Sequence, residues 1–197
     1  MTREVLLFGH VVGAILMGAG LIGVFLADLR SRQLERLALF AEAIRAIAVF
    51  YDGLVVPGAL LLLGSGVWII VAYGFNVLDT PWLAGMVGLF ALEFVEGNTV
   101  TRRYFTRMRR LSREAVRRGQ VTRELVAARA EHLPTFTHFL DLPVYVLIVS
   151  LGVVKPDDWT QFIVGGIAAV AVGAALTVFL PRLYPWTPST SGDSDAA

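Results

Sequence analysis

Five long apolar runs, separated by shorter polar segments, dominate the pattern of hydrophobic and polar positions along the chain. A helix needs about 20 apolar residues to cross the hydrocarbon layer, and each run approaches or exceeds that length. Helices are expected because an open strand would leave backbone groups without partners in lipid. The pattern therefore predicts an all-α, polytopic transmembrane bundle with five spans, at residues 5–27, 46–74, 82–100, 134–154 and 159–184.

Proline, glycine and threonine positions predict the local breaks. The second run is long enough to bend, and Pro57-Gly58 is its expected kink. Between spans three and four, residues 103–118 lack glycine and proline and should form a helix that stops at Gly119. Thr122 is placed to cap a second short helix that runs to Glu131.

Composition agrees with a membrane location. Hydrophobic residues make up 56% of the chain and charged residues 17%, and the mean hydropathy is +0.66, which is too apolar for a soluble domain. The first run is too long for a signal-peptide core, so we expect it to be retained. Because the chain has no cysteine, disulfides, thiolate metal sites and cysteine nucleophiles are excluded. Residues 1–186 should form one transmembrane domain, and residues 187–197 a disordered tail.

The basic residues predict how the bundle is oriented. The segment 28–45 holds four arginines and the loop 101–133 holds ten, whereas the alternate connections hold a single Lys155. The positive-inside rule places both arginine-rich segments in the cytoplasm of a bacterial inner membrane, with the N-terminus outside and the C-terminus cytoplasmic. The Arg102–Arg129 stretch could contact anionic lipid. Arginines are common in cytoplasmic loops because they set the orientation of the spans, so no nucleic-acid partner is expected. A homo-oligomer or a membrane complex is an open alternative.

Ionisable side chains inside the predicted spans gather at one depth. With a rise of roughly 1.5 Å per residue, each lies roughly 6–10 Å from the cytoplasmic end of its span. Ionisable groups within spans usually face the bundle interior and mark a pathway or a site. Two pairs in this set are spaced i, i+3, so each pair shares a helix face. The predicted layer consists of Asp52, Glu93, Glu96, His138 and Asp141.

Three interpretations fit this layer. Carboxylate and imidazole groups within a bundle are usual ligands of a non-haem divalent metal such as iron, manganese or zinc. The same groups without metal could form the proton or cation relay of a transporter. They could also be a structural network in which the acids pair with Arg45, Arg102 or Arg103. The Glu-x-x-His pattern of ferritin-like bundles does not occur, which argues against a di-iron centre.

His10 is a second polar position, separate from the layer. It lies roughly 8 Å inside span one from the outer side, and roughly 15–20 Å from His138 along the membrane normal. The two histidines are therefore not expected to ligate one haem. Glycines around His10 either let helices approach closely or leave space for a flat ligand such as haem. A satisfied core histidine is the other interpretation.

The early histidine in a glycine-rich first span, followed by Asp52-Gly-Leu-Val-Val-Pro57-Gly in the second, resembles an uncharacterised family of bacterial integral membrane proteins. That family is similar to the CopD copper-resistance proteins and to HemJ, the membrane protoporphyrinogen oxidase. The resemblance covers mainly residues 5–106. Through the HemJ-like members it implies a haem b ligated by His10, although spans two and three contain no histidine that could act as a further ligand.

The sequence as a whole favours a membrane haem- or metal-binding protein in redox or metal handling. A proton- or cation-coupled transporter that uses the predicted layer is one alternative. An accessory or structural subunit of a membrane complex is the other. No reaction follows from the residues alone.

Overall fold

A computed structural model describes residues 3–187 of the chain. Every regular element in that range is helical, and two of the elements are short π-helical segments. The expected disordered tail lies outside the described residues, apart from Thr187. The elements are α1 (Arg3–Arg32), α2 (Leu37–Phe50), η1 (Tyr51–Val55), α3 (Val56–Tyr73), α4 (Pro81–Glu96), η2 (Gly97–Thr101), α5 (Arg102–Arg118), α6 (Arg123–Arg129), α7 (His132–Val154) and α8 (Thr160–Leu183).

Within residues 3–187, five continuous helices are long and apolar enough to cross a membrane, which confirms the all-α polytopic fold. They are α1, α2–η1–α3, α4–η2–α5, α7 and α8. The two composite helices have 37 and 38 residues, or roughly 55 Å at the rise of an α-helix, well beyond a hydrocarbon layer of about 30 Å. Their excess length lies at the arginine-rich end of the bundle. The direction in which the helices cross the membrane stays a prediction.

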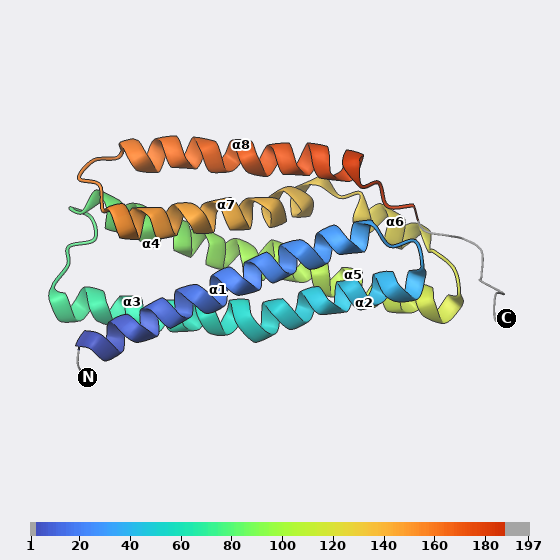
Figure 1. Ribbon diagram of the computed structural model, residues 1–197, viewed down its shortest axis with the longest axis horizontal. Helices are drawn as coiled ribbons and strands as arrows, with labels where there is room; N and C mark the ends of the chain where they lie inside the picture. Colours follow the sequence, from blue (N-terminus) through green and yellow to red (C-terminus); the bar gives the residue numbers. More distant parts are fainter. Residues whose placement is uncertain (1–2, 188–197) are drawn as a thin grey trace.

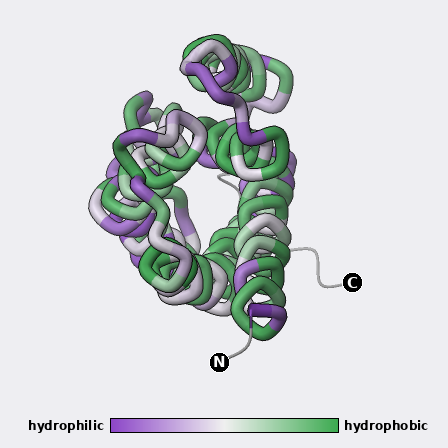
Figure 2. The backbone as a smooth tube through the Cα atoms, turned by 90° about the vertical axis from the view of Figure 1, so that its left-hand side faces the viewer, coloured by the Kyte–Doolittle hydropathy of each residue, from purple (hydrophilic) through white to green (hydrophobic). Residues whose placement is uncertain are grey.

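The helices pack in neighbouring pairs. α1 lies along α2, η1 and α3, while α7 lies between α4 and α8, and α2 packs on α5 (Figure 1). Viewed along the bundle, α8 lies outside the ring that the other helices form (Figure 2). The buried residues of α8 are Ala169 and Gly173, and most of its other residues are exposed, so much of its surface is left for lipid.

Glycines bring α1 into direct backbone contact with the second composite helix. A Cβ atom on Gly58 would lie 2.5 Å from the backbone nitrogen of Met17, and one on Gly20 would lie 2.7 Å from a methyl group of Val55. A Cβ on Gly13 would likewise lie 3.1 Å from the Gly58 carbonyl oxygen. These glycines therefore serve close helix packing.

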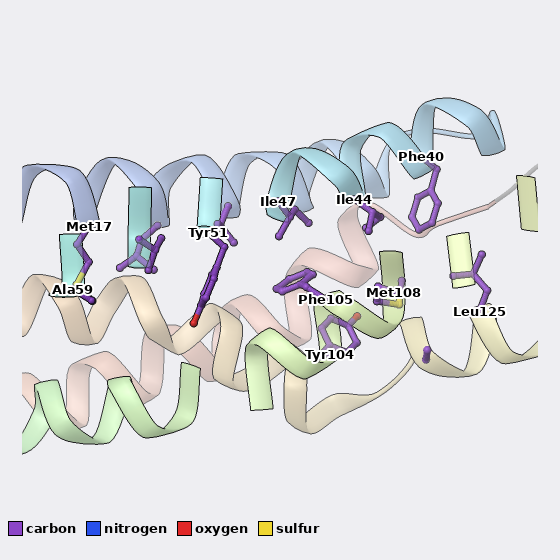
Figure 3. Close-up of a cluster of buried hydrophobic side chains, with 14 of the residues drawn as sticks. Met17, Phe40, Ile44, Ile47, Tyr51, Ala59, Tyr104, Phe105, Met108 and Leu125 are labelled. Atoms are coloured by element: carbon purple, nitrogen blue, oxygen red, sulfur yellow. The ribbon is translucent and has the colours of Figure 1, made fainter. Parts of the chain in front are cut away.

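The largest apolar core lies at the arginine-rich end. It is built from α1, α2, α5 and α6, with Tyr51 and Val55 of η1 and Ala59 of α3, and Figure 3 shows its side chains pointing toward one another between these helices. Phe40, Ile44, Met108 and Leu125 have no exposed surface, and Trp186 stacks on Phe40 with ring centroids 4.4 Å apart. The projecting helix ends thus have a packed core, and most of the arginines lie on its outside.

The loop predicted at 101–133 is largely helical. Its first half continues α4 through η2 into α5, which ends where Gly119 takes a left-handed conformation with φ of 67°. Thr122 accepts a hydrogen bond from the backbone nitrogen of Leu125 over 3.2 Å, so both the helix stop and the cap are confirmed. The capped helix, α6, ends at Arg129, two residues before the predicted end.

Candidate functional site

The five residues of the predicted layer do not form one group. They fall into three places, because the spans present them to different neighbours. Asp52 is exposed and pairs with Arg102, with a distance of 3.7 Å between the carboxylate and the guanidinium. His138 faces α1, and Asp141 faces the two glutamates of α4. Within residues 3–187, no group of three or more His, Asp or Glu side chains is arranged to hold a metal ion.

The first polar cluster joins α1, α6 and α7, and we call it the Asp28 cluster. The carboxylate of Asp28, only 1% exposed, accepts hydrogen bonds from Arg32 Nε over 3.0 Å and from Arg129 Nη1 over 2.7 Å. Arg129 Nη2 also donates to the Ser31 hydroxyl over 2.7 Å. His138 Nε2 lies 3.9 Å from Asp28 Oδ2, and the imidazole is 4% exposed. One buried acid therefore meets two buried arginines and a histidine.

Charges of opposite sign stabilise one another in the Asp28 cluster. Burial opposes the charge on Arg129, but Asp28 and Tyr104 together outweigh that effect and raise the pKa of the guanidinium. α6 is held against α1 by this contact. The cluster thereby fastens the end of the arginine-rich segment to the first span.

Asp28, Arg32 and Arg129 do not belong to the layer that the sequence predicts. Span one was expected to end at Ala27, whereas α1 continues through Arg32. The i, i+4 spacing of Asp28 and Arg32 was a signal for an ion pair. Nothing local pointed to Arg129, which lies 101 positions from its partner Asp28.

The second polar cluster joins α4 and α7, and we call it the carboxyl cluster. Its members are Glu93, Glu96 and Asp141. Asp141 is 6% exposed, and its carboxyl group lies within hydrogen-bonding reach of both glutamates. Thr101 donates a hydrogen bond to Glu96 Oε1 over 2.8 Å, while Glu96 Oε2 is buried without a partner. No Lys, Arg or His of residues 3–187 forms an ion pair with any of the three acids.

A cavity of about 210 Å³ adjoins the carboxyl cluster. It lies between η1–α3 on one side and α4–η2 on the other, with α1 and α7 behind it. Glu93 and Asp141 are the acids on its wall, and apolar or aromatic side chains make up most of the rest. The principal apolar members are Met17, Leu21, Ala59, Leu60, Phe90 and Phe94. The cavity therefore combines an apolar lining with two carboxyl groups.

The segment η1 lies directly before Pro57-Gly58, where a kink is expected from the sequence. The backbone N–H of Val56 donates to the Tyr51 carbonyl, five residues back, so the helix widens just before the proline. Proline has no N–H to donate to Gly53, and its ring crowds that carbonyl, so a wider turn removes the conflict. The irregularity consequently lies one turn earlier than predicted, and Tyr51 points between the helices (Figure 3).

The segment η2 faces η1 across the cavity. Asn98 and Thr99 bond back to the carbonyls of Phe94 and Val95, over 2.8 and 2.7 Å, which satisfies carbonyls of the last turn of α4. A Cβ atom on Gly97 would lie only 2.7 Å from the Tyr51 hydroxyl oxygen, so glycine admits the phenol. π-Helical turns occur frequently at functional sites, and here two of them border the same cavity.

His10 lies apart from both clusters, half-buried against α3. Its Nδ1 is 2.9 Å from Ser65 Oγ, and that hydroxyl donates its single proton to the Leu61 carbonyl over 2.5 Å. Ser65 must therefore accept from Nδ1–H, which leaves Nε2 as the unprotonated nitrogen of a neutral ring. The histidine is satisfied on one side and keeps one acceptor nitrogen on the other.

Comparison with known families gives one match. The family model described as "Predicted integral membrane protein (DUF2269)" matches residues 4–156. The chain belongs to this family. The matched region runs from α1 to just beyond α7, so both clusters and the cavity of this DUF2269 protein lie within it.

Membership of the DUF2269 family confirms the uncharacterised membrane family that the sequence resembled. The family match gives no evidence of similarity to CopD or HemJ, so the haem ligand assigned to His10 stays a prediction. No curated protein and no solved structure matches the chain.

Proposed function

We propose that this DUF2269 protein is a proton- or cation-coupled membrane transporter whose ion-binding site is the carboxyl cluster. One observation carries the proposal: three carboxyl groups meet beside an apolar cavity, with no basic partner among the described side chains. Adjacent carboxylates in a poorly solvated place cannot all be ionised. The cluster therefore holds a proton, or a cation in its place, and exchange between the two is the basis of coupled transport.

A line of hydroxyl groups supports exchange with the arginine-rich end of the bundle. Thr101, which bonds to Glu96, lies 3.5 Å from Thr137, oxygen to oxygen. Thr137 in turn bonds to the Pro134 carbonyl at the start of α7. Hydroxyl groups both donate and accept, so the line passes a proton toward Glu96 when the Thr137 hydroxyl releases the Pro134 carbonyl and donates to Thr101.

The other interpretations of the layer fit different residues. Structural pairing accounts for Asp52, which has Arg102, and for Asp28, which has Arg32 and Arg129. Arg45 is engaged by Glu42 over 2.6 Å, and no acid of the carboxyl cluster is paired with it. The acids around Asp141 are left without the arginine partners that a structural network needs, and this favours the relay.

Infrared difference spectroscopy on the purified full-length protein tests the proton. We expect the carbonyl band of a protonated carboxyl group at neutral pH, which Asp141→Asn removes and Asp52→Asn retains. In proteoliposomes with an internal pH dye, Glu93→Gln and Asp141→Asn should abolish proton movement driven by a membrane potential, while each variant keeps a free energy of unfolding within about 1 kcal/mol of the parent. A protein without the carboxyl band, or an Asp141→Asn variant that moves protons like the parent, contradicts the proposal.

Haem b at His10 is a second proposal, favoured by the unprotonated Nε2. Histidines that ligate metals usually donate their other ring N–H to a fixed acceptor, and Ser65 is such an acceptor. A haem there would supply electron transfer, and His10 would hold its iron. A Soret band that disappears in His10→Ala supports the proposal, and a colourless preparation rejects it.

We further propose that the arginine-rich end faces the cytoplasm of a bacterial inner membrane, as the positive-inside rule implies. Arg109, Arg110 and Arg113 line a groove between α2 and α5 and have no acidic partner among the described residues, so they are free for anionic headgroups. A reporter fused after Ala197 should be active in the cytoplasm. Binding to vesicles that contain anionic lipid should weaken in Arg113→Gln.

A further inference from the structure

We propose that the cavity beside the carboxyl cluster binds a lipophilic organic cation: an amine or quaternary ammonium group on an aromatic or aliphatic body. The inference rests on the proposed function, because it assigns a ligand class to the same site. It follows from the combination of an apolar lining, two unpaired carboxyl groups and an opening toward lipid.

The cavity opens through the side of the bundle. Leu60 on α3 and Phe94 on α4 both line it, and they are 56% and 40% exposed. These residues lie within helices that cross the membrane, so their exposed surface faces the acyl chains. A ligand that enters between them comes from the bilayer, where only compounds with a substantial apolar body accumulate.

The lining suits the body of such a ligand. Met17, Leu21 and Ala59 supply an apolar back wall from α1 and α3, while Phe90 and Phe94 supply aromatic rings from α4. Aromatic faces attract cations through the quadrupole of the ring, so this wall accepts an alkylammonium group as well as hydrocarbon. A small hydrophilic ion alone would leave most of the wall without a contact.

The charge that the cavity selects is positive. Glu93 and Asp141 face it, and no basic residue among those described neutralises them. The guanidinium of Arg102 is held by Asp52. An anion would meet like charge in a medium that screens it poorly, whereas a cation would complete the ion pair that the cluster lacks.

The cation and the proton then compete for the same carboxyl groups. When the cation binds, the cluster gives up the proton that one carboxyl group held, so one proton is released for each cation bound. The cation would bind from the bilayer, and the proton would leave along Thr101 and Thr137. The cation and the proton would then move in opposite directions.

A pair of probes that differ only in charge tests the inference. Benzyltrimethylammonium and its neutral isostere neopentylbenzene are titrated into the purified full-length protein, in weak buffer with a pH indicator. We expect the cation to bind with release of a proton and more tightly at higher pH, and the neutral isostere to release none. Glu93→Gln and Asp141→Asn should each weaken cation binding about tenfold or more, while the control Asp52→Asn binds as the parent does.

Phe94→Leu keeps the test decisive if the acidic variants fold poorly. It should weaken binding of the cation about two- to fivefold, and leave the neutral isostere unaffected, because leucine retains the apolar contact and removes the ring. Equal affinity for both probes, or undiminished cation binding in a folded Asp141→Asn, overturns the ligand class. If the protonated carboxyl band is present while neither probe binds, the proton site stands and only the cation is wrong. If the band is missing, the proposed function itself fails.

Discussion

The Asp28 cluster and the carboxyl cluster each include a buried residue of α7, yet they differ in whether an opposite charge accompanies the acids. His138 belongs to the first and Asp141 to the second, three residues apart on one helix. In the first cluster a single acid meets Arg32 and Arg129 with short hydrogen bonds. In the second, three acids meet with no basic partner among the described residues.

This difference separates a structural role from a functional one. A buried charge is tolerated when an opposite charge and hydrogen bonds accompany it, and the Asp28 cluster supplies both from within the chain, although Arg129 Nε and both His138 nitrogens are buried there without a hydrogen-bond partner. The carboxyl cluster requires a proton or a cation from outside the chain. We therefore expect the first cluster to respond to mutation in stability, and the second in binding.

Asp28→Asn should have the largest effect on stability. It leaves Arg32 and Arg129 buried without an acid, and removal of one partner from a buried pair costs about 3–5 kcal/mol. Thermal unfolding in detergent, followed by circular dichroism, measures the loss. The matched control, Asp52→Asn, breaks an exposed pair and should cost less than about 1 kcal/mol. An Asp28→Asn variant that melts with the parent would remove the structural side of the comparison.

Gly58→Ala should disturb both clusters at once, because it displaces α1, which carries Asp28 and one wall of the cavity. The new methyl group would meet the backbone of Met17 at 2.5 Å, and backbone cannot rotate away. Overpacking of this kind costs about 1–3 kcal/mol. Gly64→Ala, which meets nothing within 4 Å, is the control and should be neutral or slightly stabilising. The same melting experiment decides, and equal melting of both variants would contradict the tight contact.

Thr101→Val should lower stability by about 1 kcal/mol, because it removes the hydrogen bond to Glu96 without a change of shape. It should also slow proton movement in proteoliposomes, since the hydroxyl line is interrupted. Thr99→Val removes an exposed hydroxyl from the same π-helical segment and serves as the control. Parent rates in Thr101→Val would exclude this threonine from the path.

Asp141→Asn should have the smallest effect on stability, within about 1 kcal/mol of the parent and in either direction, although the residue is as buried as Arg32. The reason is that one acid fewer relieves the crowding of like groups. On one preparation of Asp141→Asn, the free energy of unfolding should therefore stay close to that of the parent while cation binding is weakened. A loss of stability as large as that of Asp28→Asn would show that the carboxyl cluster is structural after all.

The apolar pattern predicted the architecture well, because a membrane span must make its backbone hydrogen bonds within its own helix. Length and hydropathy located all five spans, and Gly119 and Thr122 marked helix ends that depend on a single residue. Depth along the spans also brought Glu93, Glu96 and Asp141 together correctly, because the rise per residue is fixed.

Depth could not decide which way each side chain faces. Asp52 shares the level of Asp141 but lies at the surface, and His138 shares its helix but faces α1. Rotation about the helix axis is set by contacts such as Gly58 on Met17 and Gly97 on Tyr51, and by the π-helical turns that shift the register between them. These contacts join residues far apart in the chain. The sequence alone thus predicted which polar groups lie at one level of the spans, and the tertiary structure decided which of them find an opposite charge.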